Sequence, residues 1–258
     1  MTTRLLIALA SAAMLGHADA GEPWRVLTPA DTAVTVTLSA DQSAYYIGEP
    51  LVLTLGFRNT SEVPLAGFFV PVRHKAQVHY RREGGAFAPL LPAPWRLEQE
   101  AREWRNFKRA PGLLKPGEET RTELKLVMDY PAQRFVLHEP GNYEFKVISH
   151  PAPRHPDAAV ASPVVAIRVE PVPSTERGAF AEYEKHYLGR VTSAAGYVAQ
   201  NEPETVRTAV DFVERYPDSR YSEHVRKALV SALRARVVQG RATREQQRLL
   251  EKVDPARR

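Results

Sequence analysis

The sequence of 258 residues contains no cysteine. Disulfide bonds, thiol chemistry and a lipid-anchored cysteine are therefore excluded, and the fold must be stabilised by its hydrophobic core. The sequence also lacks a G-x-S-x-G nucleophile motif, a glycine-rich phosphate-binding loop and an H-E-x-x-H metal pair. We therefore expect no enzyme activity, no cofactor and no metal site. A hydrolase whose carboxylates lie far apart in the sequence is the alternative.

No run of apolar residues reaches the length of about 20 that a membrane-spanning helix requires. The N-terminus instead has the pattern of a secretory signal peptide. Arg4 precedes a short apolar run, and Ala18 and Ala20 form a small-x-small cleavage site. We expect residues 1–20 to be removed, which leaves a periplasmic or secreted protein that begins at Gly21. A buried N-terminal helix is the alternative.

Charged residues of both signs are abundant. Lysine and arginine number 35 and aspartate and glutamate 30, which gives a formal net charge of +5. This mild surplus favours contact with an anionic envelope surface. We expect no nucleic-acid partner, because no nucleic-acid-reading motif accompanies the charge.

Apolar and polar residues alternate before residue 171. Side chains on a strand point alternately to opposite faces, so each run predicts a strand with one apolar face. Six or more such runs, separated by turn residues and with no helix between them, predict a β-sandwich. One run lies at 77–80. In the other runs the apolar positions on one face are Val34, Val36 and Leu38; Leu51, Leu53, Leu55 and Phe57; Leu124, Leu126 and Met128; Tyr143, Phe145 and Val147; and Val165, Ile167 and Val169.

The sequence GNYEF at 141–145 resembles the start of strand F in immunoglobulin-like domains. Phe145 stands where those domains have a cysteine. The segment 48–61 is similar to the opening strands of bacterial immunoglobulin-like domains, including those of the intracellular proteinase inhibitor type. The resemblance implies an immunoglobulin-like β-sandwich over 21–170, with Tyr143 as the corner tyrosine whose hydroxyl bonds back to the backbone.

A proline-containing linker at 171–175 separates this part from a helical part at 176–258. After the linker, apolar residues recur every three or four positions. Capping residues and helix breakers mark the ends of the expected helices. The expected helices lie at 176–188, at 191–200, between Asn201 and Pro217, from Asp218 or Ser219 to Gly240, and after a capping box at Thr243 to Gln246.

The sequence YPDS at 216–219, together with Ala209, Phe212, Tyr221 and Ala228, resembles a tetratricopeptide-type repeat. The form it resembles is found in bacterial envelope assembly and scaffold proteins. His224 stands where that repeat usually has a small residue. Only one repeat is visible, and stacked repeats need about three units to bury a continuous core, so we expect a short helical-hairpin domain. The resemblance implies that this domain binds other proteins.

The segment 94–109 interrupts the strand pattern and holds two of the three tryptophans. Trp104, Arg105 and Phe107 form a candidate partner-binding surface, because tryptophan and arginine dominate binding hot spots. The alternative is a short amphipathic helix packed against the protein itself. The test is whether Trp104 is exposed.

Two pairs of histidines, His74 with His79 and His150 with His155, are each spaced by five residues. An odd spacing on a strand places two rings on opposite faces, so neither pair forms a metal clamp. We expect these histidines and His138 to be exposed.

The sequence thus predicts an exported, non-catalytic binding or scaffold protein of the cell envelope with a protein partner. Two alternatives belong to other classes. One is inhibition of an exported protease through an exposed loop at 150–157, and the other is an enzyme that acts on polysaccharide or peptidoglycan.

Overall fold

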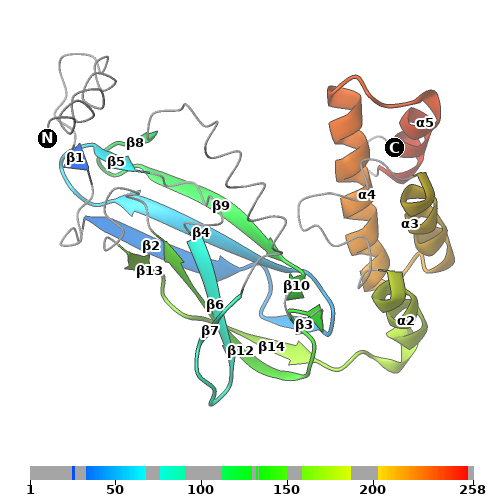
Figure 1. Ribbon diagram of the computed structural model, residues 1–258, viewed down its shortest axis with the longest axis horizontal. Coiled ribbons are helices and arrows are strands. Elements are labelled where there is room, and N and C mark those ends of the chain that lie inside the picture. Colours follow the sequence, from blue (N-terminus) through cyan, green and yellow to red (C-terminus); the bar gives the residue numbers. More distant parts are fainter. Residues whose placement is uncertain are drawn as a thin grey trace, which may run out of the picture.

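A computed structural model of the chain describes residues 25–26, 33–67, 76–90, 112–129, 132, 134–149, 159–186 and 203–254. Strands precede the linker and helices follow it, and the two parts lie side by side (Figure 1). This confirms the predicted order of the two structural classes along the chain. No helix in the described ranges is both long and apolar enough to cross a membrane.

A three-stranded antiparallel sheet contains β2 (Val34–Ala40), β4 (Leu51–Asn59) and β9 (Glu119–Leu126) in the order β2-β4-β9. Leu38 lies opposite Leu55, and Leu53 lies opposite Leu124. The apolar side chains of β2 and β4 are buried at alternate positions, as the period of two predicts.

A larger sheet has the order β3-β14-β12-β6-β7, and β13 also pairs with β12. Neighbouring strands in this sheet are antiparallel, except that β14 and β3 are parallel. Its strands are β3 (Ala44–Tyr46), β6 (Ala76–Arg82), β7 (Ala88–Pro89), β12 (Gly141–Ser149), β13 (Val160–Ala161) and β14 (Val165–Glu170). Short strands complete the part: β1 (Arg25–Val26), β5 (Leu65–Gly67), β8 (Gly112–Leu114), β10 (Met128–Asp129) and β11 (Arg134–Phe135).

One hydrophobic core joins the inner faces of the two main sheets. Leu55 and Phe57 of β4 and Phe145 and Val147 of β12 are almost completely buried in it. Burial of such side chains contributes about 1.5–3 kcal/mol each, which offsets the lack of covalent cross-links.

The run ending at Met128 differs from the prediction. Leu124, Leu126 and Met128 were expected on one face of a strand, but β9 ends at Leu126 and the buried Val127 follows. Leu124 belongs to the core of the strand part, whereas Val127 and Met128 belong to a second core shared with the helices. The alternation of buried and outward-facing residues breaks at this point, because the chain passes from one core to the other.

Tyr143 makes the predicted corner contact. Its hydroxyl donates a hydrogen bond to the carbonyl oxygen of Glu139 at 3.1 Å, and its side chain is fully buried. Phe145 fills the buried position expected for it and stacks on Tyr143 with ring centroids 6.4 Å apart.

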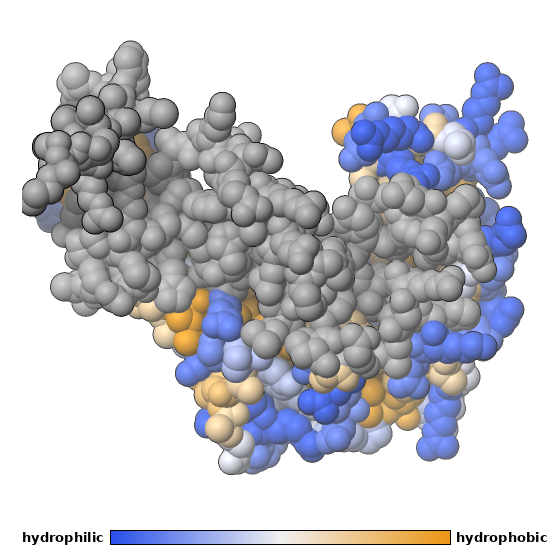
Figure 2. Space-filling view, viewed as in Figure 1, coloured by the Kyte–Doolittle hydropathy of each residue, from blue (hydrophilic) through white to orange (hydrophobic). Residues whose placement is uncertain are grey.

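The helical part begins with a short 3-10 turn, η1 (Ser174–Glu176), that leads directly into the first helix. Hydrophilic residues cover the visible outer side of this part (Figure 2). Its helices are α2 (Arg177–His186), α3 (Pro203–Arg215), α4 (Arg220–Val238) and α5 (Arg244–Val253). The helix expected at 191–200 and the cap at Asn201 lie outside the described residues.

The predicted helix ends agree with the structure where it describes them. Ser219 is the N-cap of α4, and its hydroxyl accepts a hydrogen bond from the backbone N–H of Tyr221. Thr243 and Gln246 form the capping box of α5. Phe212 of α3 is 4% exposed, because it packs against Tyr183 and Tyr216.

We expect Tyr143→Phe to lower the free energy of unfolding by about 1 kcal/mol, since it removes one buried hydrogen bond and keeps the ring. Urea denaturation measures the change. Tyr143→Leu serves as the comparison because it also removes the stacked ring, and it should cost more. Equal stability of wild type and Tyr143→Phe would show that the corner bond contributes nothing.

Candidate functional site

A buried carboxylate connects the two parts of the chain. Glu49 lies in the turn between β3 and β4, and its side chain has no solvent exposure. One of its oxygens accepts a hydrogen bond from the backbone N–H of Tyr46 at 2.7 Å. Arg220 of α4 approaches the same carboxylate with Nε at 2.8 Å and Nη2 at 3.0 Å, and Nε2 of His224 lies 3.4 Å away. A buried charge requires such partners, so this turn fixes the start of α4.

Two tyrosine hydroxyls add to this junction. Tyr221 of α4 donates to the carbonyl oxygen of Ile47 at 2.7 Å, and Tyr183 of α2 donates to that of Gly48 at 3.2 Å. Burial, and next the negative charge of Glu49, raises the pKa of Tyr221. The hydroxyl therefore stays protonated and remains a donor over the physiological pH range.

Aromatic packing fills the space around these hydrogen bonds. Phe135 of β11 stacks on Tyr183 with ring centroids 5.6 Å apart and contacts Phe180 at 6.2 Å. Gly48 has φ +80°, and a Cβ atom there would lie 2.8 Å from the ring of Phe180. Only glycine fits this close approach of turn and helix. The second hydrophobic core thus contains residues from both parts of the chain.

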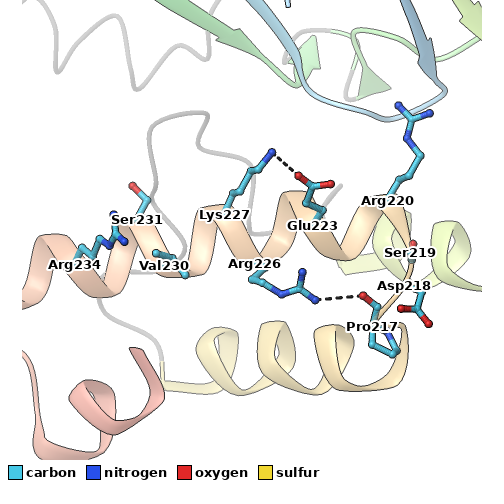
Figure 3. Close-up of a pocket in the computed structure, with 10 residues that line it drawn as sticks. All are labelled: Pro217, Asp218, Ser219, Arg220, Glu223, Arg226, Lys227, Val230, Ser231 and Arg234. Atoms are coloured by element: carbon cyan, nitrogen blue, oxygen red, sulfur yellow. Dashed lines mark hydrogen bonds and ion pairs between the residues drawn. The ribbon is translucent and has the colours of Figure 1, made fainter. Parts of the chain in front are cut away.

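A groove of about 630 Å³ runs along the face of α4 next to this junction. Arg220, Glu223 and Lys227 extend from one side of α4 toward the strand part (Figure 3). Glu223 and Lys227 form an exposed ion pair at 2.6 Å. Arg226 turns toward the end of α3, where its Nη2 donates to the carbonyl oxygen of Pro217 at 3.3 Å. The groove therefore presents a polar helix face with exposed charged side chains.

Lys125 of β9 carries a charge for which the described residues provide no salt bridge. Burial, and next the positive charge of Lys227, lowers the pKa of Lys125. Asp41 acts weakly in the opposite direction. The positive charges of Lys125 and Lys227 therefore repel each other.

The histidines differ from the expectation of full exposure. His79 is half-buried, and its enclosed Nε2 atom has no hydrogen-bond partner in the structure as described. Burial, and next Lys146, lowers its pKa. His138 is also half-buried, with Nδ1 3.3 Å from the carbonyl oxygen of Val136. These positions were predicted wrongly because side chains of the outer faces are partly covered by neighbouring residues.

The predicted partner-binding residues Trp104, Arg105 and Phe107 lie outside the described residues, as does the loop at 150–157. The same holds for His74. Among the residues that the structure describes, no group of three or more histidine, aspartate or glutamate side chains is arranged to hold a metal ion.

The sequence reasoning missed both the junction and the groove. Arg220, Lys227 and Arg234 are spaced by seven residues, which on a helix aligns three cations along one face. That spacing could have revealed the groove face. No comparable signal marks Glu49, whose partners lie 171 and 175 residues away in the sequence.

No family model matches the chain, and no curated protein matches it either.

Solved structures give only distant likenesses. The alkylpurine DNA glycosylase AlkC of Pseudomonas fluorescens is 12% identical over 54% of this chain and 30% of that protein, with a TM-score of 0.32. The sporulation control protein Spo0M of Bacillus subtilis is 10% identical over 59% of this chain and 55% of that protein, with a TM-score of 0.31. A CARDB domain from Pyrococcus furiosus is 9% identical over 53% of this chain and 87% of the domain, with a TM-score of 0.27. Scores this low assign neither a fold nor a function.

We expect Glu49→Gln to lower the free energy of unfolding by about 2–3 kcal/mol, because it removes the charge that Arg220 and His224 surround. Hydrogen exchange at the backbone amide of Tyr46, which donates to the Glu49 carboxylate, should also become faster, since the turn opens more often.

The matched control is Glu223→Gln, which removes an exposed carboxylate from α4, the helix that carries Arg220 and His224. Its effect should stay within about 0.5 kcal/mol. Equal effects of the two substitutions would contradict the assigned role of Glu49.

We expect Lys125→Met to raise the free energy of unfolding at neutral pH by roughly 1 kcal/mol. The pKa of Lys125 is lowered in the folded protein, so the unfolded chain holds that proton more tightly and the wild type gains stability as pH rises. The advantage of the variant should therefore disappear above the ordinary lysine pKa of 10.5.

Urea unfolding at neutral and alkaline pH measures this effect. Lys115→Met, at an exposed turn position, is the control and should change little. A gain that persists at alkaline pH would show that packing, not charge, explains it.

Proposed function

We propose that this protein is an exported, non-catalytic binding or scaffold protein of the bacterial cell envelope. Export rests on the signal-peptide pattern at 1–20. A non-catalytic role rests on the lack of recognisable catalytic motifs in the sequence. The observation that carries the proposal is the groove along α4, whose position relative to the strand part is fixed by the buried junction around Glu49.

The finer architecture is part of the same proposal. An immunoglobulin-like β-sandwich over 21–170 is supported by two sheets that share one core and by the hydroxyl contact of Tyr143 with Glu139. A tetratricopeptide-like arrangement within 176–258 is supported by α3 and α4, which are joined through YPDS and pack against each other. Both folds commonly present surfaces to partner proteins.

The groove suits a protein partner better than a small molecule. Its described lining comes from α4 and the turn before it, so it is a surface strip and not an enclosed cavity. Side chains such as Glu223 and Lys227 are more than half exposed and can exchange their mutual ion pair for contacts with a partner. A second contact surface at Trp104, Arg105 and Phe107 stays a prediction from the sequence.

A photo-cross-linking amino acid at Ser231, an exposed position in the groove, tests this function. In envelope preparations of the source bacterium we expect one protein adduct of defined mass. The same amino acid at Gln247, exposed on α5 away from the groove, is the control and should not give that adduct. The purified partner should then bind the wild-type protein. No adduct at Ser231, or identical adducts at both positions, would contradict the proposal.

A further inference from the structure

Three cations form a row along the groove face of α4. Arg220, Lys227 and Arg234 all line the groove and are seven residues apart. Seven residues make nearly two turns of helix, so the three side chains share one face with a spacing of about 10.5 Å along the axis. The carboxylate within this row is that of Glu223, and Asp218 lies at the end of the groove.

Buried carboxylates hold the two outer arginines in place. Arg220 is bound by Glu49, which has no exposed side-chain area, and Arg234 is bound by Asp254, which is 2% exposed. Nε and Nη2 of Arg234 both lie within 2.9 Å of the same Asp254 oxygen. The side chains of the two arginines themselves remain 40% and 51% exposed. A ligand in the groove therefore meets the cations and cannot reach the carboxylates behind them.

This arrangement lowers the cost of binding an anion. A guanidinium that is already fixed loses little side-chain entropy when it binds a carboxylate, and its Nη1 donors are not used by Glu49 or Asp254. Among the described residues, the middle cation, Lys227, has a salt bridge only with Glu223, and this pair is exposed. Lys125, near Lys227, adds a positive charge without a salt bridge in the described part of the chain.

We propose that the α4 groove binds an extended acidic segment of a partner protein whose carboxylates lie three residues apart and pair with Arg220, Lys227 and Arg234. The proposal rests on the protein-binding function proposed above and names the chemistry of the partner.

The spacing favours a peptide chain. In the extended polyproline II conformation three residues make one full turn, so side chains three residues apart lie on one face at about 9 Å, close to the interval between successive cations of the row. A seven-residue segment with acidic side chains at its first, fourth and seventh positions therefore spans the row from Arg220 to Arg234. The groove is a hollow strip between protruding side chains, which a flat bilayer surface would fill poorly. Glu223 opposes this binding in two ways. Its negative charge repels the acidic segment, and its ion pair with Lys227 must break before Lys227 can bind the segment.

Fluorescence anisotropy with a labelled nine-residue peptide tests the proposal. The peptide has glutamate at its second, fifth and eighth positions and serine or threonine elsewhere, and the protein is the full mature chain at low ionic strength. We expect saturable binding that Lys227→Gln weakens about tenfold, the value of one charge-assisted hydrogen bond. Glu223→Gln should tighten binding, because it removes the competing carboxylate.

Binding of the peptide should also raise the pKa of Lys125, which is followed by NMR of isotopically methylated lysines. The added negative charge favours the protonated amine. This readout reports occupancy of the groove without depending on the stability of the variants.

The matched control is Lys252→Gln on α5, where the lysine is about as exposed as Lys227 and pairs with Glu214 instead. It removes the same charge and should leave peptide binding unchanged. Circular dichroism and urea unfolding verify that each variant is folded.

Several outcomes would overturn the proposal. Equal weakening by Lys227→Gln and Lys252→Gln, or equal binding of a peptide with three consecutive glutamates, would leave only a general charge effect. Stronger, Lys227-dependent binding to phosphatidylglycerol vesicles would identify a lipid surface instead. If the peptide does not bind but cross-linking at Ser231 still gives its adduct, the acidic segment is wrong while the protein-binding function stands.

Discussion

The buried carboxylate of Glu49 is the interaction on which the relation between the two parts of the molecule depends. It sits at a turn of the strand part and receives Arg220 and His224 from α4. A buried charge without partners is costly. If the helical part moved away from the turn, the carboxylate would either become exposed or remain buried without its partners. The hydroxyls of Tyr183 and Tyr221 follow the same logic, since both donate to carbonyl oxygens of this turn. A chain without disulfides thus gains a fixed geometry from polar groups buried among aromatic rings.

Different residues of α4 contact the second core, contact the strand part and line the groove. Tyr221, Val225 and Leu229 lie in the second core, and Tyr221 and His224 also bond to the strand part. The remaining face lines the groove. The ends of α4 are linked to buried acids at Glu49 and Asp254, so the groove face is presented by a helix that is held at both ends. The same ion pairs that fix the fold therefore also orient the cations that we propose for binding.

Much of the fold could be predicted from local pattern. The alternation of Val34, Val36 and Leu38 predicted β2, and the Ser219 and Thr243 caps marked the starts of α4 and α5. The less successful predictions concern residues whose surroundings come from distant parts of the chain. Met128 packs in the core shared with the helices and not in the core that holds Leu124, and the ring of His79 is partly enclosed, because neighbours that do not appear in the local pattern cover them.

The joint YPDS at 216–219 illustrates the limit of reading a sequence alone. Proline, a capping serine and helical periodicity are local properties, so the sequence determined that one helix ends here and another begins. Likewise, the period of two in the first part and the lack of cysteine determined a strand-rich region without covalent cross-links. Only the tertiary structure decided that the residues after the joint, Arg220, Tyr221 and His224, bind a turn more than 170 residues earlier. The physical reason is that burial and ion pairing depend on which surfaces meet in space, and a local pattern does not specify that meeting.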